Sequence, residues 1–153
     1  MTIAPIVRTV TTKASPARAF ELFTAHAGAW WGKGQTIGKK DHEVIVIEPR
    51  AGGRWYEADA EGTECQWGKV LTWEPPHRLV LAWQLNSQWQ YDPDFITELE
   101  LSFSPADGGG TVVTLEHRDL ECFGADAAKH AASLTGGWPK HMDQFAVYAD
   151  ANS

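Results

Sequence analysis

The chain has 153 residues, 43% of them hydrophobic and 22% charged, which suits a single domain over residues 1–153 with a full core. Its formal net charge of −7, with 13 scattered lysines and arginines, argues against nucleic-acid binding, because affinity for phosphate comes from clustered positive charge. No stretch approaches the roughly 18 apolar residues of a membrane span, and residues 1–10 lack a signal-peptide pattern, so we expect a cytoplasmic protein without a membrane partner.

The N-terminal part of the chain predicts one strand and two short helices. Residues 5–13, rich in valine, isoleucine and threonine, predict a strand. Ser15 followed by Pro16 is typical of a helix start, with serine as the N-cap and proline in the first turn. Residues 26–31 predict a second short helix.

The middle of the chain alternates apolar and polar residues with a period of two, which predicts antiparallel strands joined by short turns. Glycine and proline mark most of the turns, and a longer loop covers residues 86–94. Six strands are expected, over residues 43–48, 54–60, 64–73, 79–85, 96–103 and 111–120.

The C-terminal part predicts helix. Residues 125–134 are rich in alanine, and residues 138–149 carry apolar side chains at three- and four-residue spacing. Gly136 and Gly137 lie between them, so either two helices meet there or one long helix tolerates the pair because something packs closely against it. We expect residues 150–153 to form a frayed tail.

The order of these elements predicts an α+β fold. Seven strands joined mainly by short turns form a curved antiparallel sheet, and two short helices follow the first strand. Because a sheet with one apolar face must cover it, the long C-terminal helix is expected to lie on that face.

Short motifs in the expected order support this fold. The motifs are Ser15-Pro16-Ala17, Trp30-Trp31-Gly32, Gly52-Gly53-Arg54-Trp55, Gly68-Lys69-Val70, Pro75-Pro76-His77-Arg78-Leu79, Thr111 to His117, and Gly137-Trp138. Together they resemble the homologues of the activator of heat-shock protein 90 ATPase, a branch of the START-like (SRPBCC) superfamily with the helix-grip fold.

The resemblance implies an internal cavity between the sheet and the C-terminal helix, but it does not imply one activity. Relatives include binders of lipids and other apolar molecules, polyketide cyclases and co-chaperone domains, and a fold alone cannot choose among them. The chain lacks the extra N-terminal domain of the eukaryotic co-chaperones, so we do not expect it to activate a chaperone.

Strand parity predicts which side chains face that cavity. His117 shares the inward face of its strand with two apolar residues, and Trp83 lies on an apolar face of another strand. The expected ligand pocket consists of Trp83, Leu99, Leu101, Phe103, Val113, Leu115, His117, Trp138, Met142 and Phe145.

Two interpretations of His117 remain open. It is either a neutral, hydrogen-bonded core histidine, or a ligand anchor or acid–base group, since histidine titrates near neutral pH. Asp119 has the same parity and would orient the imidazole if the strand continues that far. Glu57 and Asp59 are interpreted as solvated residues at the sheet edge.

No metal or cofactor site is expected. Cys65 and Cys122 have no CxxC spacing, and His130 and His141 are too far apart for a metal pair on one helical turn.

The leading functional hypothesis is therefore the binding of a small apolar or amphipathic molecule rather than catalysis. A cyclase- or hydrolase-type enzyme that uses His117 is the first alternative, and a co-chaperone-like interaction module is the second. A homodimer is compatible with the sequence.

Overall fold

The computed structural model describes residues 2–32 and 37–153. Its strands form one seven-stranded sheet in the order β1-β7-β6-β5-β4-β3-β2, and every neighbouring pair is antiparallel. The elements in chain order are β1 (Ile6–Thr12), α1 (Pro16–Thr24), α2 (Ala27–Trp30), β2 (Val44–Ile47), β3 (Arg54–Ala58), β4 (Glu64–Glu74), β5 (Arg78–Trp83), β6 (Thr97–Pro105), β7 (Thr111–Arg118), η1 (Leu120–Asp126) and α3 (Ala127–Ala151).

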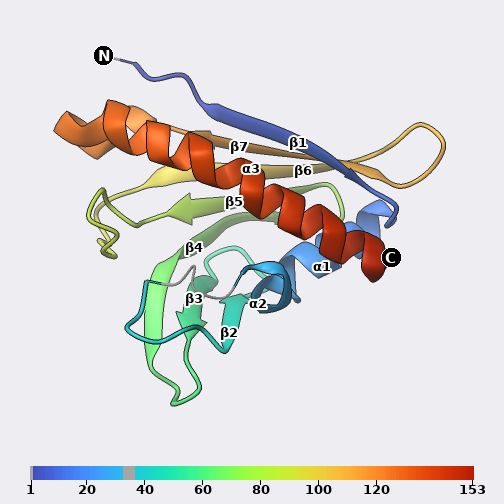
Figure 1. Cartoon of the computed structure of the whole chain (residues 1–153), viewed down its shortest axis with the longest axis horizontal. Helices are drawn as coiled ribbons and strands as arrows, with labels where there is room; N and C mark the ends of the chain where they lie inside the picture. The colour runs from blue at the N-terminus through green and yellow to red at the C-terminus, as the bar shows by residue number, and fades with distance from the viewer. Residues whose placement is uncertain (1, 33–36) are drawn as a thin grey trace.

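The sheet curls around α3, which crosses one of its faces with its C-terminal end beside α1 (Figure 1). Side chains of α1 close the core at that end, because Phe20 and Phe23 both pack on Phe103 of β6, and Phe23 also contacts Phe145 of α3. The predicted order of strands and helices and the helix-grip arrangement are confirmed.

The curl of the sheet has local causes in β3 and β4. The pairing register shifts at Trp55/Tyr56 and again between Val70 and Thr72, and such bulges bend and twist a strand. Between them lies Gly68, where an added Cβ would stand 1.8 Å from the carbonyl oxygen of Ala82, so no side chain fits. The bulges and this close approach bend the part of the sheet that β3 and β4 form.

α3 is one continuous helix that contains Gly136, Gly137 and Pro139. Beyond its chain neighbours and the adjacent backbone of α3, a Cβ built on either glycine meets no described atom within 4 Å, so close packing does not explain the pair. The helix also includes Asp150, whose carboxylate accepts hydrogen bonds from Thr12 Oγ1 and Lys13 N. The expected frayed tail is therefore wrong for residues 150 and 151.

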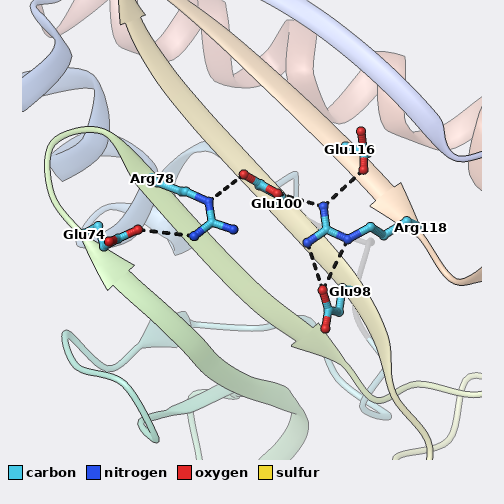
Figure 2. Close-up of polar contacts among 6 residues, drawn as sticks. All are labelled: Glu74, Arg78, Glu98, Glu100, Glu116 and Arg118. Atoms are coloured by element: carbon cyan, nitrogen blue, oxygen red, sulfur yellow. Dashed lines mark hydrogen bonds and ion pairs between the residues drawn. The ribbon is translucent and has the colours of Figure 1, made fainter.

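The sheet face away from α3 is polar and cross-linked by ion pairs (Figure 2). Arg118 of β7 donates to carboxylates of Glu98, Glu100 and Glu116 at 2.7–3.1 Å, and Arg78 of β5 donates to the other oxygen of Glu100 at 2.7 Å. The hydrogen bond from Arg78 is the main reason that the pKa of Glu100 is lowered. The charges of this face are paired with one another, whereas the opposite face is apolar and covered by α3.

Candidate ligand-binding site

A pocket of about 530 Å³ opens between the first half of α3, the strands β4 and β5, and the loop after β5. Five of the eight tryptophans of the chain line it, and they come from five separate segments. The described residues on its wall are Trp31, Ile37, Trp67, Trp83, Leu85, Trp89, Ser133, Leu134, Gly137, Trp138 and His141.

Three of these tryptophans are held by their indole N–H groups. Trp67 donates to Glu57 Oε1 at 2.9 Å, Trp83 to the carbonyl oxygen of Leu85 at 3.1 Å, and Trp138 to His117 Nδ1 at 3.1 Å. A buried indole N–H needs such a partner, and these partners fix how each ring lies. The rings also contact one another, with Trp83 and Trp138 at a centroid distance of 5.6 Å.

His117 lies behind this aromatic wall and is fully buried. Because an indole N–H only donates, Nδ1 accepts from Trp138, which leaves the proton on Nε2, where Thr97 Oγ1 is 2.8 Å away. Thr97 Oγ1 in turn lies 3.4 Å from the carbonyl oxygen of Trp83. Burial lowers the pKa of His117 to about 3, with a smaller contribution from His130, so the imidazole is neutral.

Both ring nitrogens of His117 are thus hydrogen-bonded inside the protein. The geometry is that of a core histidine which orients Trp138, and it offers no free proton acceptor to a ligand.

Asp119 does not orient His117, and that expectation is wrong. β7 ends at Arg118, and Asp119 has a left-handed backbone with φ of 66°, where the chain turns into η1. The alternation of strand faces ends at Arg118, one residue before Asp119, so Asp119 does not share the face of His117. The polar partners of His117 come instead from β6 and α3.

The structure brings only two of the ten predicted pocket residues, Trp83 and Trp138, onto the wall of this pocket. Strand parity identified the inward face correctly, but it does not say how far along that face the open space lies. α1, α2 and the second half of α3 fill the remainder of the face. The other predicted residues are packed in the interior with at most 1% exposure: Leu99, Leu101, Phe103, Val113, Leu115, His117, Met142 and Phe145.

Several residues of the pocket wall were not predicted as site residues from the sequence. Trp31 and Gly137 belong to motifs that carried the family resemblance, and that was the available signal. Glu57 was interpreted as solvated, which is wrong: it is 2% exposed, and its Oε1 accepts from Trp67 Nε1 and from the backbone N–H of Ile37 at 2.7 Å. Glu57 therefore holds one wall tryptophan and one backbone segment of the pocket together.

Two further histidines lie near the pocket. His141 lines it and stacks on Trp31, with ring centroids 4.0 Å apart and an interplanar angle of 13°. His130 packs between Trp89 and Phe123. In the part of the chain that the structure describes, no group of three or more His, Cys, Asp and Glu side chains could hold a metal ion.

A curled antiparallel sheet around a C-terminal helix, with a pocket between them, defines a helix-grip protein of the START-like class. The model of the family described as "Activator of Hsp90 ATPase homolog 1-like protein" matches residues 13–150, and the chain belongs to this family. Among curated proteins, none matches the chain. Among the helices formed by the described residues, none has the length and apolar character needed to cross a bilayer.

Several solved structures are similar to this chain over nearly its whole length. The chain is 37% identical to the anthrahydroquino-gamma-pyrone synthase Txn09. The match covers 95% of this chain and 96% of that one, with a TM-score of 0.67. It is 29% identical to CalC from Micromonospora echinospora, described as a self-sacrificing resistance protein, covering 98% and 96% with a TM-score of 0.75. Protein MLL2253 from Mesorhizobium loti, 20% identical over 97% and 98% with a TM-score of 0.69, shares the fold.

Proposed function

We propose that this protein binds a planar, polycyclic aromatic molecule in the tryptophan-lined pocket. The observation that carries the proposal is the wall itself: five indoles from five segments surround one open space of about 530 Å³. Ligand pockets in this size range are mostly apolar, with a few placed polar groups. Indole faces and edges bind flat aromatic rings by stacking and by edge-to-face contact.

Gly137 supports this proposal because it keeps the pocket open. A glycine inside a helix costs about 1 kcal/mol relative to alanine. Gly137 lines the pocket, and beyond its chain neighbours and the adjacent backbone of α3 a Cβ added there would meet no described atom within 4 Å, so a side chain at this position would project into unfilled space. The missing side chain thus makes room for a ligand and not for the protein's own packing.

The comparison with Txn09 also supports an aromatic ligand. That protein is named as an anthrahydroquino-gamma-pyrone synthase, and the match covers 95% of this chain at 37% identity. A fused, flat ring system of this kind matches the shape and chemistry of a pocket walled by indoles.

The test measures binding of anthraquinone to the full chain by equilibrium dialysis, with a matched pair of variants. Gly137→Leu fills the pocket, whereas Gly136→Leu puts the same side chain on the neighbouring, exposed position of α3, outside the wall. Both variants lose a helical glycine, so both should unfold at or above the wild-type temperature.

We expect Gly137→Leu to weaken anthraquinone binding at least tenfold and Gly136→Leu to leave it within about twofold. Absence of saturable binding to the wild type would refute the proposal. Equal effects of the two variants would also count against it, because they would place the ligand outside this pocket.

An enzyme that closes a ring on an aromatic substrate is the second candidate, favoured by the identity to a named synthase. His117 is not its general base in this geometry, because both of its nitrogens are already hydrogen-bonded. Incubation with an open-chain hydroxyanthraquinone precursor, followed by chromatography, separates the candidates: ring closure faster than in buffer indicates an enzyme, and retention of unchanged precursor indicates a binding protein.

A further inference from the structure

α3 places the imidazole of His141 among the aromatic rings of the pocket wall. Its imidazole stacks on Trp31 at 4.0 Å and meets Trp138 at a centroid distance of 5.7 Å with the rings nearly perpendicular, at 74°. These two contacts fix the plane of the ring. Burial lowers the pKa of His141 to about 4, so at neutral pH it is an uncharged imidazole with one N–H and one lone pair.

The surroundings of the ring decide which nitrogen carries the proton. Nδ1 is buried and meets no partner of hydrogen-bonding geometry among the described residues. Gln144, one turn further along α3, has its Oε1 buried and likewise unpartnered, and its side chain is close enough to oppose the fall in the pKa of His141. Gln144 favours protonation of the ring and Nδ1 is its buried nitrogen, so we assign the proton to Nδ1, which leaves the lone pair on Nε2 for a ligand.

We propose that His141 determines the specificity of the pocket by accepting, through Nε2, a hydrogen bond from a hydroxyl group on the aromatic ligand. This inference rests on the proposed function and deepens it. The tryptophans bind any flat ring system, whatever its substituents, while a neutral imidazole acceptor held at a fixed angle distinguishes a hydroxylated ring from a bare one. A site built to pair with a hydroxyl rejects the analogue that lacks it, because its polar group is then left without a partner.

The experiment compares two probes that differ by one hydroxyl, anthraquinone and 2-hydroxyanthraquinone. Binding of each to the full chain is measured by equilibrium dialysis at mildly acidic pH, where the probe stays protonated and His141 stays neutral. His141→Phe keeps the stack on Trp31 but removes the acceptor. His77→Phe, in the turn before β5 and outside the pocket, is the matched control.

We expect His141→Phe to weaken 2-hydroxyanthraquinone by about five- to tenfold, the effect of one neutral hydrogen bond, and to leave anthraquinone within about twofold. His77→Phe should change neither. His141→Gln places an amide oxygen near the position of Nε2, so it should weaken both probes through the lost stack while keeping most of the preference for the hydroxyl.

Three outcomes would overturn the inference. Equal losses for both probes in His141→Phe would make His141 a packing residue only. Unchanged binding of both probes in His141→Phe would show that the hydroxyl lies elsewhere. Loss of the preference for the hydroxylated probe in Ser133→Ala would show the same, because Ser133 is another polar side chain among the described wall residues. Failure of the wild type to bind either probe is a different result, because it refutes the proposed function itself.

Discussion

Replacement of His117 by leucine should destabilise the protein by about 2–4 kcal/mol. Leucine has nearly the volume of histidine, so the change removes hydrogen bonds without opening a large cavity. It strands the indole N–H of Trp138 in a buried site and removes the 2.8 Å partner of Thr97 Oγ1. A buried polar group without a partner costs about 1–3 kcal/mol, and Thr97 retains its weaker contact with the Trp83 carbonyl.

Urea denaturation followed by circular dichroism measures this loss. With an m-value of about 2 kcal/mol per molar urea, the midpoint should fall by roughly 1–2 M at an unchanged slope. The double variant His117→Leu/Trp138→Phe removes the stranded N–H as well. If the stranded donor causes the loss, Trp138→Phe should cost less in the His117→Leu background than in the wild type, by about 1–2 kcal/mol.

A change of less than about 0.5 kcal/mol in His117→Leu, or additive effects in the double variant, would refute this reasoning. A catalytic base held ready for a substrate gives the opposite pattern. Removing it typically leaves stability unchanged or raises it, because active sites retain groups that are costly to stability. The measurement therefore also weighs the core interpretation of His117 against the enzymatic one.

Trp89 has a left-handed backbone with φ of 60°, which glycine adopts without strain, and its side chain is 45% exposed. Trp89→Gly should therefore keep or raise the melting temperature while weakening anthraquinone binding several-fold. Loss of stability without loss of binding would contradict this. The pKa values of His117 and His141 are lowered to about 3 and about 4, so the unfolded chain takes up protons first and stability falls as the pH drops below about 6.5. Urea titrations at several pH values should show a shallower fall in His117→Leu, by up to about 1.4 kcal/mol per pH unit, and an unchanged dependence would count against a neutral His117. Arg118→Met leaves three carboxylates without their shared cation, which should cost about 1 kcal/mol at low ionic strength and less in high salt; a cost independent of salt would indicate lost packing instead.

The sequence predicted the fold well because the fold depends on local signals. These signals are period-two alternation, glycine and proline turns, and the serine–proline helix start. Each acts over a few residues, and together they define the order of strands and helices along the chain. Ser15 does cap α1, with its Oγ accepting from the N–H of Arg18. The predicted end of a strand was wrong where the backbone conformation of one residue sets it. Asp119, for example, has a left-handed conformation that ends β7.

The site was harder to predict because it depends on contacts between distant segments. Trp31, Trp67 and Trp138 meet only when α2, β4 and α3 are folded together, and nothing local marks them as neighbours. Glu57 illustrates the same limit. A glutamate on a short strand is ordinarily solvated, and it is buried here only because Trp67 and the Ile37 backbone supply donors from elsewhere in the chain.

The tryptophan rings of the pocket wall are held rigidly, which bears on the flexibility of the ligand that the pocket can bind. The N–H groups of Trp67, Trp83 and Trp138 are bound to the protein, so these rings lose little freedom when a ligand enters. Binding cost includes the ordering of both partners, and a rigid wall lowers the protein's share. A flexible apolar chain would still pay its own ordering cost, of about 0.5–1.5 kcal/mol for each rotamer-rich group immobilised at a binding surface. A fused aromatic ring system has no such freedom to lose, so under the proposed function a wall of tethered indoles should favour planar ligands over lipid-like ones.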